Sequence, residues 1–143
     1  SLLAPDLEKQ YQVKKICDEN NIDFFAYSPL SFGILCIDPD KEQNKEKSFI
    51  RNALFENYKK PTYELRRCLK RIANQRSVSQ AQVAINWCCY QGAIPLVGMR
   101  KKSQVIDVSN VFKWNLNKSE FKVLQELSKK CLKKMPKNPF SSI

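Results

Sequence analysis

The sequence has no histidine among its 143 residues, and it lacks any apolar run close to the roughly 20 residues that a membrane-spanning helix requires. None of its six cysteines belongs to a Cys-x-x-Cys motif. Because protein zinc sites are built from closely spaced cysteines, histidines or both, we expect no metal site. The first residues also lack the basic segment of a signal peptide, so we expect a soluble chain with no membrane insertion.

Most of the cysteines lie on predicted apolar helix faces, and the six do not form a spacing pattern typical of metal sites or disulfides. Cys17, Cys68, Cys88 and Cys131 each fall among apolar residues at helical spacing, where a thiol behaves as a small hydrophobe. This use of cysteine is typical of a reducing compartment. We therefore expect a cytoplasmic protein, or one from another reducing intracellular compartment.

The formal net charge of +11 indicates an anionic partner, such as nucleic acid, an anionic membrane surface or a phosphorylated cofactor. The lysines are scattered and have acidic residues between them, a pattern typical of solvated helix faces. Our main expectation is therefore no nucleic-acid partner. Nucleic-acid binding stays an alternative, with Lys59, Lys60, Lys133 and Lys134 as its phosphate contacts.

The order of apolar segments predicts one α/β domain over residues 1–143, in which parallel strands alternate with helices. Leu2-Leu3 looks like the end of a strand, and the runs 22–27 and 93–98 are typical of strands buried on both faces. Segments 36–48 and 136–143 are expected to be a loop and an irregular tail. Helices are predicted over 6–20, 49–58 and 103–114. A further helix is expected after an N-cap at Thr62. Capping boxes predict two more, one from Ser79 and Gln82 to Gly92 and one that starts at Asn117 and Glu120.

The same helical periods predict the core. The helix after Ser79 is apolar almost all round, so we expect it to be the most buried. Trp87 and Trp114 sit in apolar patterns and are expected to be core anchors. The apolar faces of the neighbouring helices consist of Leu65, Cys68, Leu69 and Ile72, and of Phe121, Leu124, Leu127 and Cys131.

Two motifs carry chemistry, and each follows a predicted strand. Tyr27 to Gly33 supplies a planar ring, hydroxyl groups and a glycine that allows close approach to the backbone. Gly98 to Gln104 supplies a cationic cluster and the start of a helix, where free amides and the Arg100 fork suit a phosphate. Ligands of parallel α/β folds lie beyond the carboxyl ends of the strands. Together the motifs predict a site for a planar, phosphorylated ligand.

Four motifs resemble the C-terminal part of the aldo-keto reductases, in order and spacing, across nearly the whole chain. They are Tyr27-Ser28-Pro29-Leu30 with Gly33 and Leu35, Gln82-Val83-Ala84-Ile85-Asn86-Trp87, Ile94-Pro95-Leu96-Val97-Gly98-Met99-Arg100 with Gln104, and Trp114-Asn115-Leu116-Asn117 with Glu120. The resemblance implies a (β/α)8 TIM barrel, a fold of about 250 residues. This chain would be its C-terminal portion, an incomplete barrel.

The resemblance also implies NADPH-dependent reduction of a small carbonyl substrate, an aldehyde or ketone, to an alcohol. Tyr27 would stack on the nicotinamide ring, and Asp107 matches an acidic position near the adenine. Ser28, Leu30 and Gly33 would line the pyrophosphate, and Arg100, with Lys101 and Gln104, would hold the adenosine 2′-phosphate and its neighbourhood. The resemblance also implies that Pro29 and Gly98 belong to the cofactor site. Two departures from the family pattern are Val108, where asparagine is often found, and Cys36-Ile37, where Thr-Gly often follows the loop.

Family members place a catalytic Asp, Tyr, Lys and His tetrad on earlier strands. This sequence contains nothing of that region and no histidine. We therefore expect no catalytic residue in the chain, no carbonyl reduction by the chain alone, and completion of the barrel by an N-terminal part. Open strand edges further predict a homo-oligomer, an assembly with swapped elements or partial order. An alternative is a cofactor-sensing module, like the channel subunits related to this family, which would keep the roles of Tyr27 and Arg100 without turnover.

Overall fold

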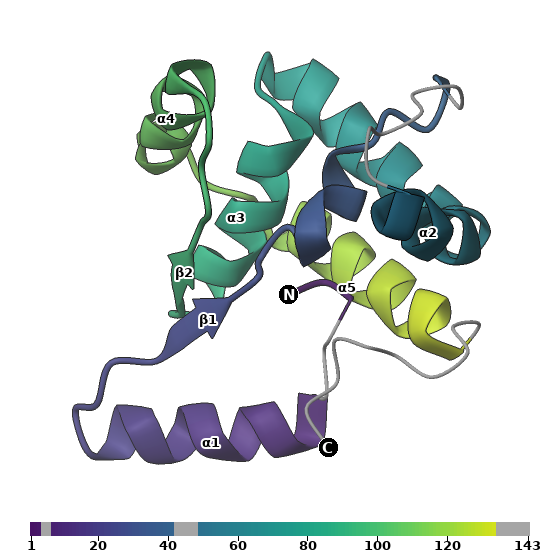
Figure 1. The fold of residues 1–143 in the computed structure, drawn as a ribbon. Coiled ribbons are helices and arrows are strands. Elements are labelled where there is room, and N and C mark those ends of the chain that lie inside the picture. Colours follow the sequence, from purple (N-terminus) through teal and green to yellow (C-terminus); the bar gives the residue numbers. More distant parts are fainter. Residues whose placement is uncertain (4–6, 42–48, 134–143) are drawn as a thin grey trace.

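The computed structural model describes residues 1–3, 7–41 and 49–133, with side chains at 1–3, 12–41 and 56–131. Two short parallel strands and a set of helices make it an α/β protein (Figure 1). In chain order the elements are α1 (Leu7–Glu19), β1 (Phe25–Tyr27), the 3₁₀ segment η1 (Ser31–Cys36), α2 (Phe49–Arg76), α3 (Gln80–Tyr90), β2 (Ile94–Leu96), α4 (Lys102–Ser109), the 3₁₀ turn η2 (Val111–Lys113) and α5 (Lys118–Lys133).

The two strands pair in parallel, and α2 and α3 lie between them in the chain. Their positions were predicted, but the expectation that they are buried on both faces is wrong. Side chains alternate across a strand, so Phe25 and Tyr27 share one face with Ile94 and Leu96. That face is open: Tyr27 is 66% exposed and Leu96 is 52% exposed, because no described element covers it. The register pairs Phe25 with Ile94, Ala26 with Pro95 and Tyr27 with Leu96.

The hydrophobic core lies between α2, α3, α5 and η1. On α3 every side chain from Gln82 to Cys88 is buried, which confirms the prediction that this helix is the most buried. Trp87 belongs to the core cluster and Trp114 packs against it, so both act as core anchors. The predicted faces of the other two helices are also confirmed, with Leu65, Cys68, Leu69, Ile72, Leu124 and Cys131 buried and Phe121 and Leu127 packed against them.

Burial also affects the thiols. Cys68, Cys88 and Cys131 are buried, whereas Cys17 is only partly so. Desolvation raises the pKa of the Cys88 thiol to about 11, because the apolar surroundings disfavour the thiolate. Cys88 therefore serves as a packing group at neutral pH.

Helix α2 differs from the prediction of two helices separated by Lys59-Lys60-Pro61, because it runs without a break from Phe49 to Arg76. A proline inside a helix removes one backbone donor and disturbs the preceding turn. Here the Thr62 hydroxyl donates to the carbonyl of Tyr58 at 2.6 Å, and the Arg66 guanidinium donates to the carbonyl of Lys59 at 2.8 Å. These side-chain donors stabilise the turn before Pro61, so Thr62 lies inside the helix and caps nothing.

The ends of the other helices agree better with the sequence. Ser79 accepts a bond from the Gln82 N–H at the start of α3, as predicted, but the Gln82 side chain bonds elsewhere. At the start of α5, both bonds of the predicted capping box form. The Glu120 N–H donates to the Asn117 side-chain oxygen at 2.9 Å, and the Asn117 N–H donates to the Glu120 carboxylate at 2.8 Å. The helix predicted over 103–114 is shorter, since α4 ends at Ser109 and η2 follows.

The first helix lies apart from the others in Figure 1, and its Val13 and Ile16 are exposed. Before it, Leu2 and Leu3 form a turn instead of a strand end, and both are buried. The Ser128 hydroxyl donates to the Leu2 carbonyl at 2.6 Å. Within the described residues no helix is both long and apolar enough to cross a bilayer. Most of the predicted loop 36–48 and all of the tail 136–143 lie outside these residues.

Candidate functional site

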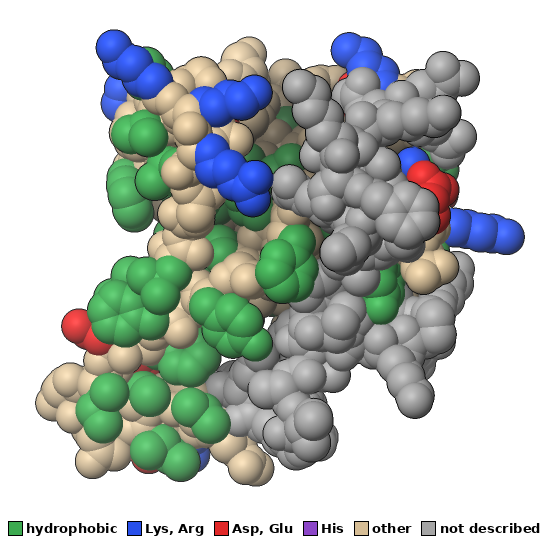
Figure 2. All heavy atoms as spheres, viewed as in Figure 1, with side chains coloured by type: hydrophobic (Ala, Val, Ile, Leu, Met, Phe, Trp, Pro, Cys, Tyr) green, Lys and Arg blue, Asp and Glu red, His purple; other side chains and the backbone are tan. Residues whose placement is uncertain are grey.

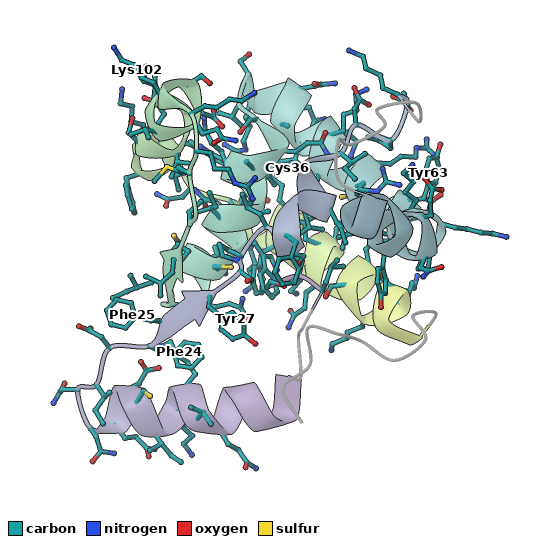
Figure 3. All side chains as sticks on the ribbon, viewed as in Figure 1. Phe24, Phe25, Tyr27, Cys36, Tyr63 and Lys102 are labelled. Atoms are coloured by element: carbon teal, nitrogen blue, oxygen red, sulfur yellow. The ribbon has the colours of Figure 1, made fainter. Side chains whose placement is uncertain are left out.

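The parallel pairing of β1 and β2 brings the two predicted motifs to one edge of the sheet. Tyr27 and Leu96 are partners at the carboxyl ends of their strands, so the chain leaves the sheet at neighbouring points toward Ser28 and toward Gly98. Figure 3 shows the Tyr27 ring beside β1, with Lys102 at the distant end of α4. The pairing confirms that both motifs follow adjacent strands, and a ligand crossing this edge would meet both.

The segment after Tyr27 has an unusual backbone. Ser28, Ser31 and Phe32 have φ values of 49°, 49° and 56°, and Gly33 has 95°. Residues other than glycine seldom adopt this left-handed region, and each such position costs on the order of 1 kcal/mol. Two backbone bonds hold the turns, from the Ser31 N–H to the Ser28 carbonyl and from the Gly33 N–H to the Leu30 carbonyl, each at 2.9 Å. The loop Ser28–Cys36 thus keeps a conformation that its own sequence disfavours.

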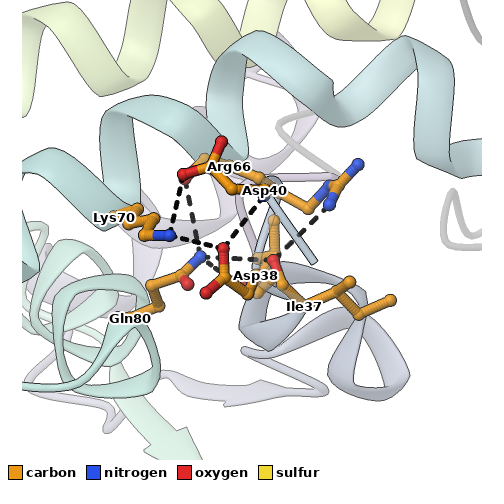
Figure 4. A network of polar contacts seen from close by, with 7 residues as sticks. Ile37, Asp38, Asp40, Arg66, Lys70 and Gln80 are labelled. Carbon is orange, nitrogen blue, oxygen red and sulfur yellow. Dashed lines mark hydrogen bonds and ion pairs between the residues drawn. The ribbon is translucent and has the colours of Figure 1, made fainter. Parts of the chain in front are cut away.

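A polar network holds the far end of this loop against α2 and α3 (Figure 4). Lys70 on α2 donates to Asp38 at 2.6 Å and to Asp40 at 2.8 Å. The Lys70 hydrogen bond and the Asp40 N–H keep the pKa of the Asp38 carboxyl below its usual value, and the two carboxylates raise the pKa of Lys70. On α3, the Gln80 amide donates to the Leu35 carbonyl at 3.3 Å.

The second motif forms a cationic tip at the start of α4. Arg100, Lys101 and Lys102 are exposed, and blue side chains gather over this end of the molecule in Figure 2. No carboxylate of the described residues forms an ion pair with any of the three. The Gln104 side-chain oxygen accepts the N–H groups of Arg100 and Lys101 at 2.8 and 3.0 Å, which fixes the turn into the helix.

Asp107 is placed differently from the rest of the predicted set. It lies on the side of α4 that faces α3, where its carboxylate accepts the Ser79 hydroxyl at 2.6 Å and the Gln82 amide at 2.7 Å. Gln82 in turn accepts the Trp114 indole N–H at 3.0 Å. These bonds attach α4 to the buried helix, and the predicted contact with adenine stays a prediction.

Comparison with known proteins decides the family. The model of the aldo/keto reductase family matches residues 1–129. This chain belongs to that family. Aldo/keto reductases are NAD(P)H-dependent oxidoreductases that reduce carbonyl groups. The sequence resemblance is thereby confirmed.

Individual relatives are longer proteins. Over 142 residues the chain is 33% identical to the chloroplastic pyridoxal reductase of Arabidopsis thaliana, covering 99% of this chain and 38% of that protein. It is 28% identical to Protein REDOX 2 of Catharanthus roseus, in a match that covers 83% of this chain and 30% of that protein. It is 26% identical to a putative aryl-alcohol dehydrogenase of Schizosaccharomyces pombe, in a match that covers 83% of this chain and 37% of that protein. This aldo/keto reductase chain therefore spans only 30 to 38% of the length of these curated relatives.

Sequence reasoning missed Asp38, Lys70 and Gln80 as residues that support the site. In the sequence, Asp38-Pro39-Asp40 is only part of the predicted loop 36–48. Nothing in the sequence joins it to Lys70, which lies about thirty residues later. Gln82 was predicted only as a helix cap, and its bonds to Asp107 and Trp114 depend on the packing of α4 against α3. Among the described residues, no group of three or more cysteine or acidic side chains is placed to hold a metal ion.

Proposed function

We propose that this chain is the cofactor-binding, C-terminal portion of a (β/α)8 TIM barrel, in an NADPH-dependent reductase of aldehydes or ketones. The pairing of Tyr27 with Leu96 carries the proposal, because it starts the loop Ser28–Cys36 and the segment Gly98–Gln104 at adjacent strand ends. A dinucleotide is an extended ligand with an aromatic ring at one end and phosphates along its length. A loop and a cationic helix start at one sheet edge match that shape.

The cationic tip would hold the adenosine 2′-phosphate. Arg100 offers a planar fork for bidentate contact, and Lys101 adds a second charge beside the amides at the start of α4. A Cβ atom built on Gly98 would have no heavy atom within 4 Å, so a ligand can approach this backbone closely. The charges lack acidic partners among the described residues, which favours NADPH over NADH.

The loop end of the site would hold the rest of the cofactor. The exposed Tyr27 ring would stack on the nicotinamide, and Ser28, Leu30 and Gly33 would line the pyrophosphate, whereas Pro29 is buried. Asp107 would contact the adenine through carboxylate lone pairs that do not already accept the bonds from Ser79 and Gln82. When bound, NADPH supplies the hydride that reduces the carbonyl carbon.

Because the sequence has no histidine and no match to the family's catalytic tetrad, the proton that accompanies this hydride would come from residues outside this chain. We propose that an N-terminal part of the barrel supplies the catalytic residues and covers the open face of Phe25, Tyr27, Ile94 and Leu96. Without that part, the exposed apolar face favours a homo-oligomer or a swapped assembly. A reducing compartment, such as the cytoplasm, fits the buried thiols.

Binding of the two nicotinamide cofactors tests the assigned site. In the native protein that contains this chain, Arg100→Glu should weaken NADPH binding about tenfold or more and leave NADH nearly unchanged, since only NADPH carries the 2′-phosphate. The control is Lys122→Glu, which changes an exposed charge on α5. Equal losses for both cofactors would refute the role of Arg100.

The intact mass of the native protein distinguishes the proposed reductase from a cofactor-sensing module. A mass near 35 to 40 kDa, about that of a complete barrel, supports a reductase, and the purified protein should then reduce a reactive aldehyde with NADPH. A mass near 16.7 kDa, with NADPH binding but no turnover, would favour a cofactor-sensing module instead.

A further inference from the structure

The loop proposed to receive the pyrophosphate needs support from outside itself. Three of its residues other than glycine, Ser28, Ser31 and Phe32, have positive φ values. Strained positions of this kind persist only where the surrounding structure fixes them. At its first end the loop continues from β1, and the Ser31 hydroxyl lies 2.9 Å from the Ser1 hydroxyl.

At its other end, the loop is followed, after Ile37, by the two carboxylates that Lys70 binds. The Asp38 carboxylate accepts both the Lys70 ammonium and, at 3.0 Å, the N–H of Asp40. Lys70 also reaches the Asp40 carboxylate, so one side chain closes the turn after Ile37 and ties it to α2. Gln80 adds a second attachment, from the start of α3 to the carbonyl of Leu35.

These contacts contribute little to the core. The side chains of Lys70 and Asp38 are 26% and 28% exposed, and that of Asp40 is 62% exposed. Ion pairs between side chains this exposed typically add little to folding stability, because water and salt screen them. Arg66, by contrast, is buried and supports the turn before Pro61 as well, so its replacement would disturb α2. Lys70 is therefore the member of the network that can be removed without unfolding the helix.

We propose that Lys70 is a positioning residue for the cofactor: by holding Asp38 and Asp40 against α2, it keeps the loop Ser28–Cys36 in the conformation that receives the pyrophosphate. This inference rests on the proposed function. Lys70 touches neither the cofactor nor the substrate. Its contribution is preorganisation, because a loop already in its bound conformation loses less conformational entropy on binding.

Two ligands test this role in the native protein that contains this chain. Lys70→Met should weaken NADPH binding about fivefold, the factor that corresponds to roughly 1 kcal/mol of lost preorganisation. Adenosine 2′-monophosphate has no pyrophosphate, so its affinity for the cationic tip should not change. Lys70→Arg should restore NADPH binding, since a guanidinium can also bind two carboxylates, and the control Lys122→Met should behave as wild type.

The possible failures can be told apart. If wild type does not bind NADPH, the proposed function fails, and the cofactor role of Lys70 fails with it. If wild type binds NADPH and Lys70→Met binds it equally well, only the role of Lys70 is overturned. The same holds if both ligands weaken alike, because that result indicates general damage. Amide hydrogen exchange adds a readout without ligand: Gly33 and Ile37 should exchange faster in Lys70→Met, and unchanged rates would show that Lys70 does not fix the loop.

Discussion

Arg76 near the end of α2 and Glu120 in the first turn of α5 form a two-bonded ion pair, with N to O distances of 2.9 and 2.8 Å. The Arg76 guanidinium also lies over the Trp114 ring, 5.2 Å from its centroid. Glu120 accepts the Asn117 N–H as well, so one carboxylate caps α5 and attaches it to α2. The pair thus joins residues 44 positions apart in sequence and fixes how the two core helices meet.

The Arg76–Glu120 pair should make stability depend on pH in the acid range. Burial raises the pKa of Glu120, but the bonds from Arg76 and Asn117 outweigh it, so the pKa of this carboxyl in the folded protein lies below its usual value of about 4.5. The contribution is therefore complete above pH 4.5 and is lost as pH falls through the lowered pKa. Urea unfolding from pH 6 to about pH 3 should show a smaller acid loss in Glu120→Gln, by about 1 kcal/mol. Glu126→Gln, which changes an exposed carboxylate, is the control, and equal acid slopes in both variants would contradict the prediction.

The two tryptophans should respond differently to the loss of the indole N–H. Trp114 donates to the Gln82 side chain at 3.0 Å, whereas the buried Trp87 N–H has no partner among the described residues. Replacing each by benzothienylalanine exchanges the N–H for sulfur with little change of shape. At position 114 we expect a loss of about 1 kcal/mol, and at 87 no loss or a small gain. Thermal unfolding measures both, and an equal loss at the two positions would refute the assignment.

Asn86 should be among the most sensitive polar residues. Its side-chain amide donates to the carbonyls of Val111 and Trp114 at 3.2 and 2.8 Å, and its oxygen accepts the Leu116 N–H at 3.0 Å. Asn86→Leu leaves these buried backbone groups without partners, which should cost about 3 kcal/mol in chemical denaturation. Asn74→Leu, on the exposed face of α2, serves as the matched control. A similar cost for both variants would mean that the buried bonds contribute little.

Alanine substitutions at Gly92 and Gly98 test two different effects, backbone strain at Gly92 and ligand access at Gly98. Gly92 ends α3 with a φ of 73°, so Gly92→Ala should lower the free energy of unfolding by about 1 kcal/mol. Gly98→Ala meets nothing within 4 Å and should leave the free energy of unfolding unchanged. If a cofactor phosphate approaches this backbone, Gly98→Ala should still weaken NADPH binding. Calorimetry with and without NADPH measures both effects, and unchanged binding would argue against contact at Gly98.

Local signals in the sequence predicted those features that depend on neighbours within one or two turns. The Ser79 cap, the Asn117 and Glu120 box and the end of α3 at Gly92 were all predicted, because capping uses side chains three residues apart. The helix break predicted at Pro61 is wrong for the opposite reason. The helix continues because Arg66, seven residues from Lys59, donates to its carbonyl, and no rule for helix ends includes that bond.

The sequence by itself determined the family, the positions of the two strands, most of the helices and the two motifs that follow the strands, because residue types and short spacings carry that information. Only the tertiary structure decided which distant groups meet: Lys70 with Asp38, Asp107 with Ser79 and Gln82, and Arg76 with Glu120. It also decided that the sheet face of Tyr27 is open. Burial and polar pairing depend on which surfaces come together when the chain folds, and periodicity within one segment does not contain that information.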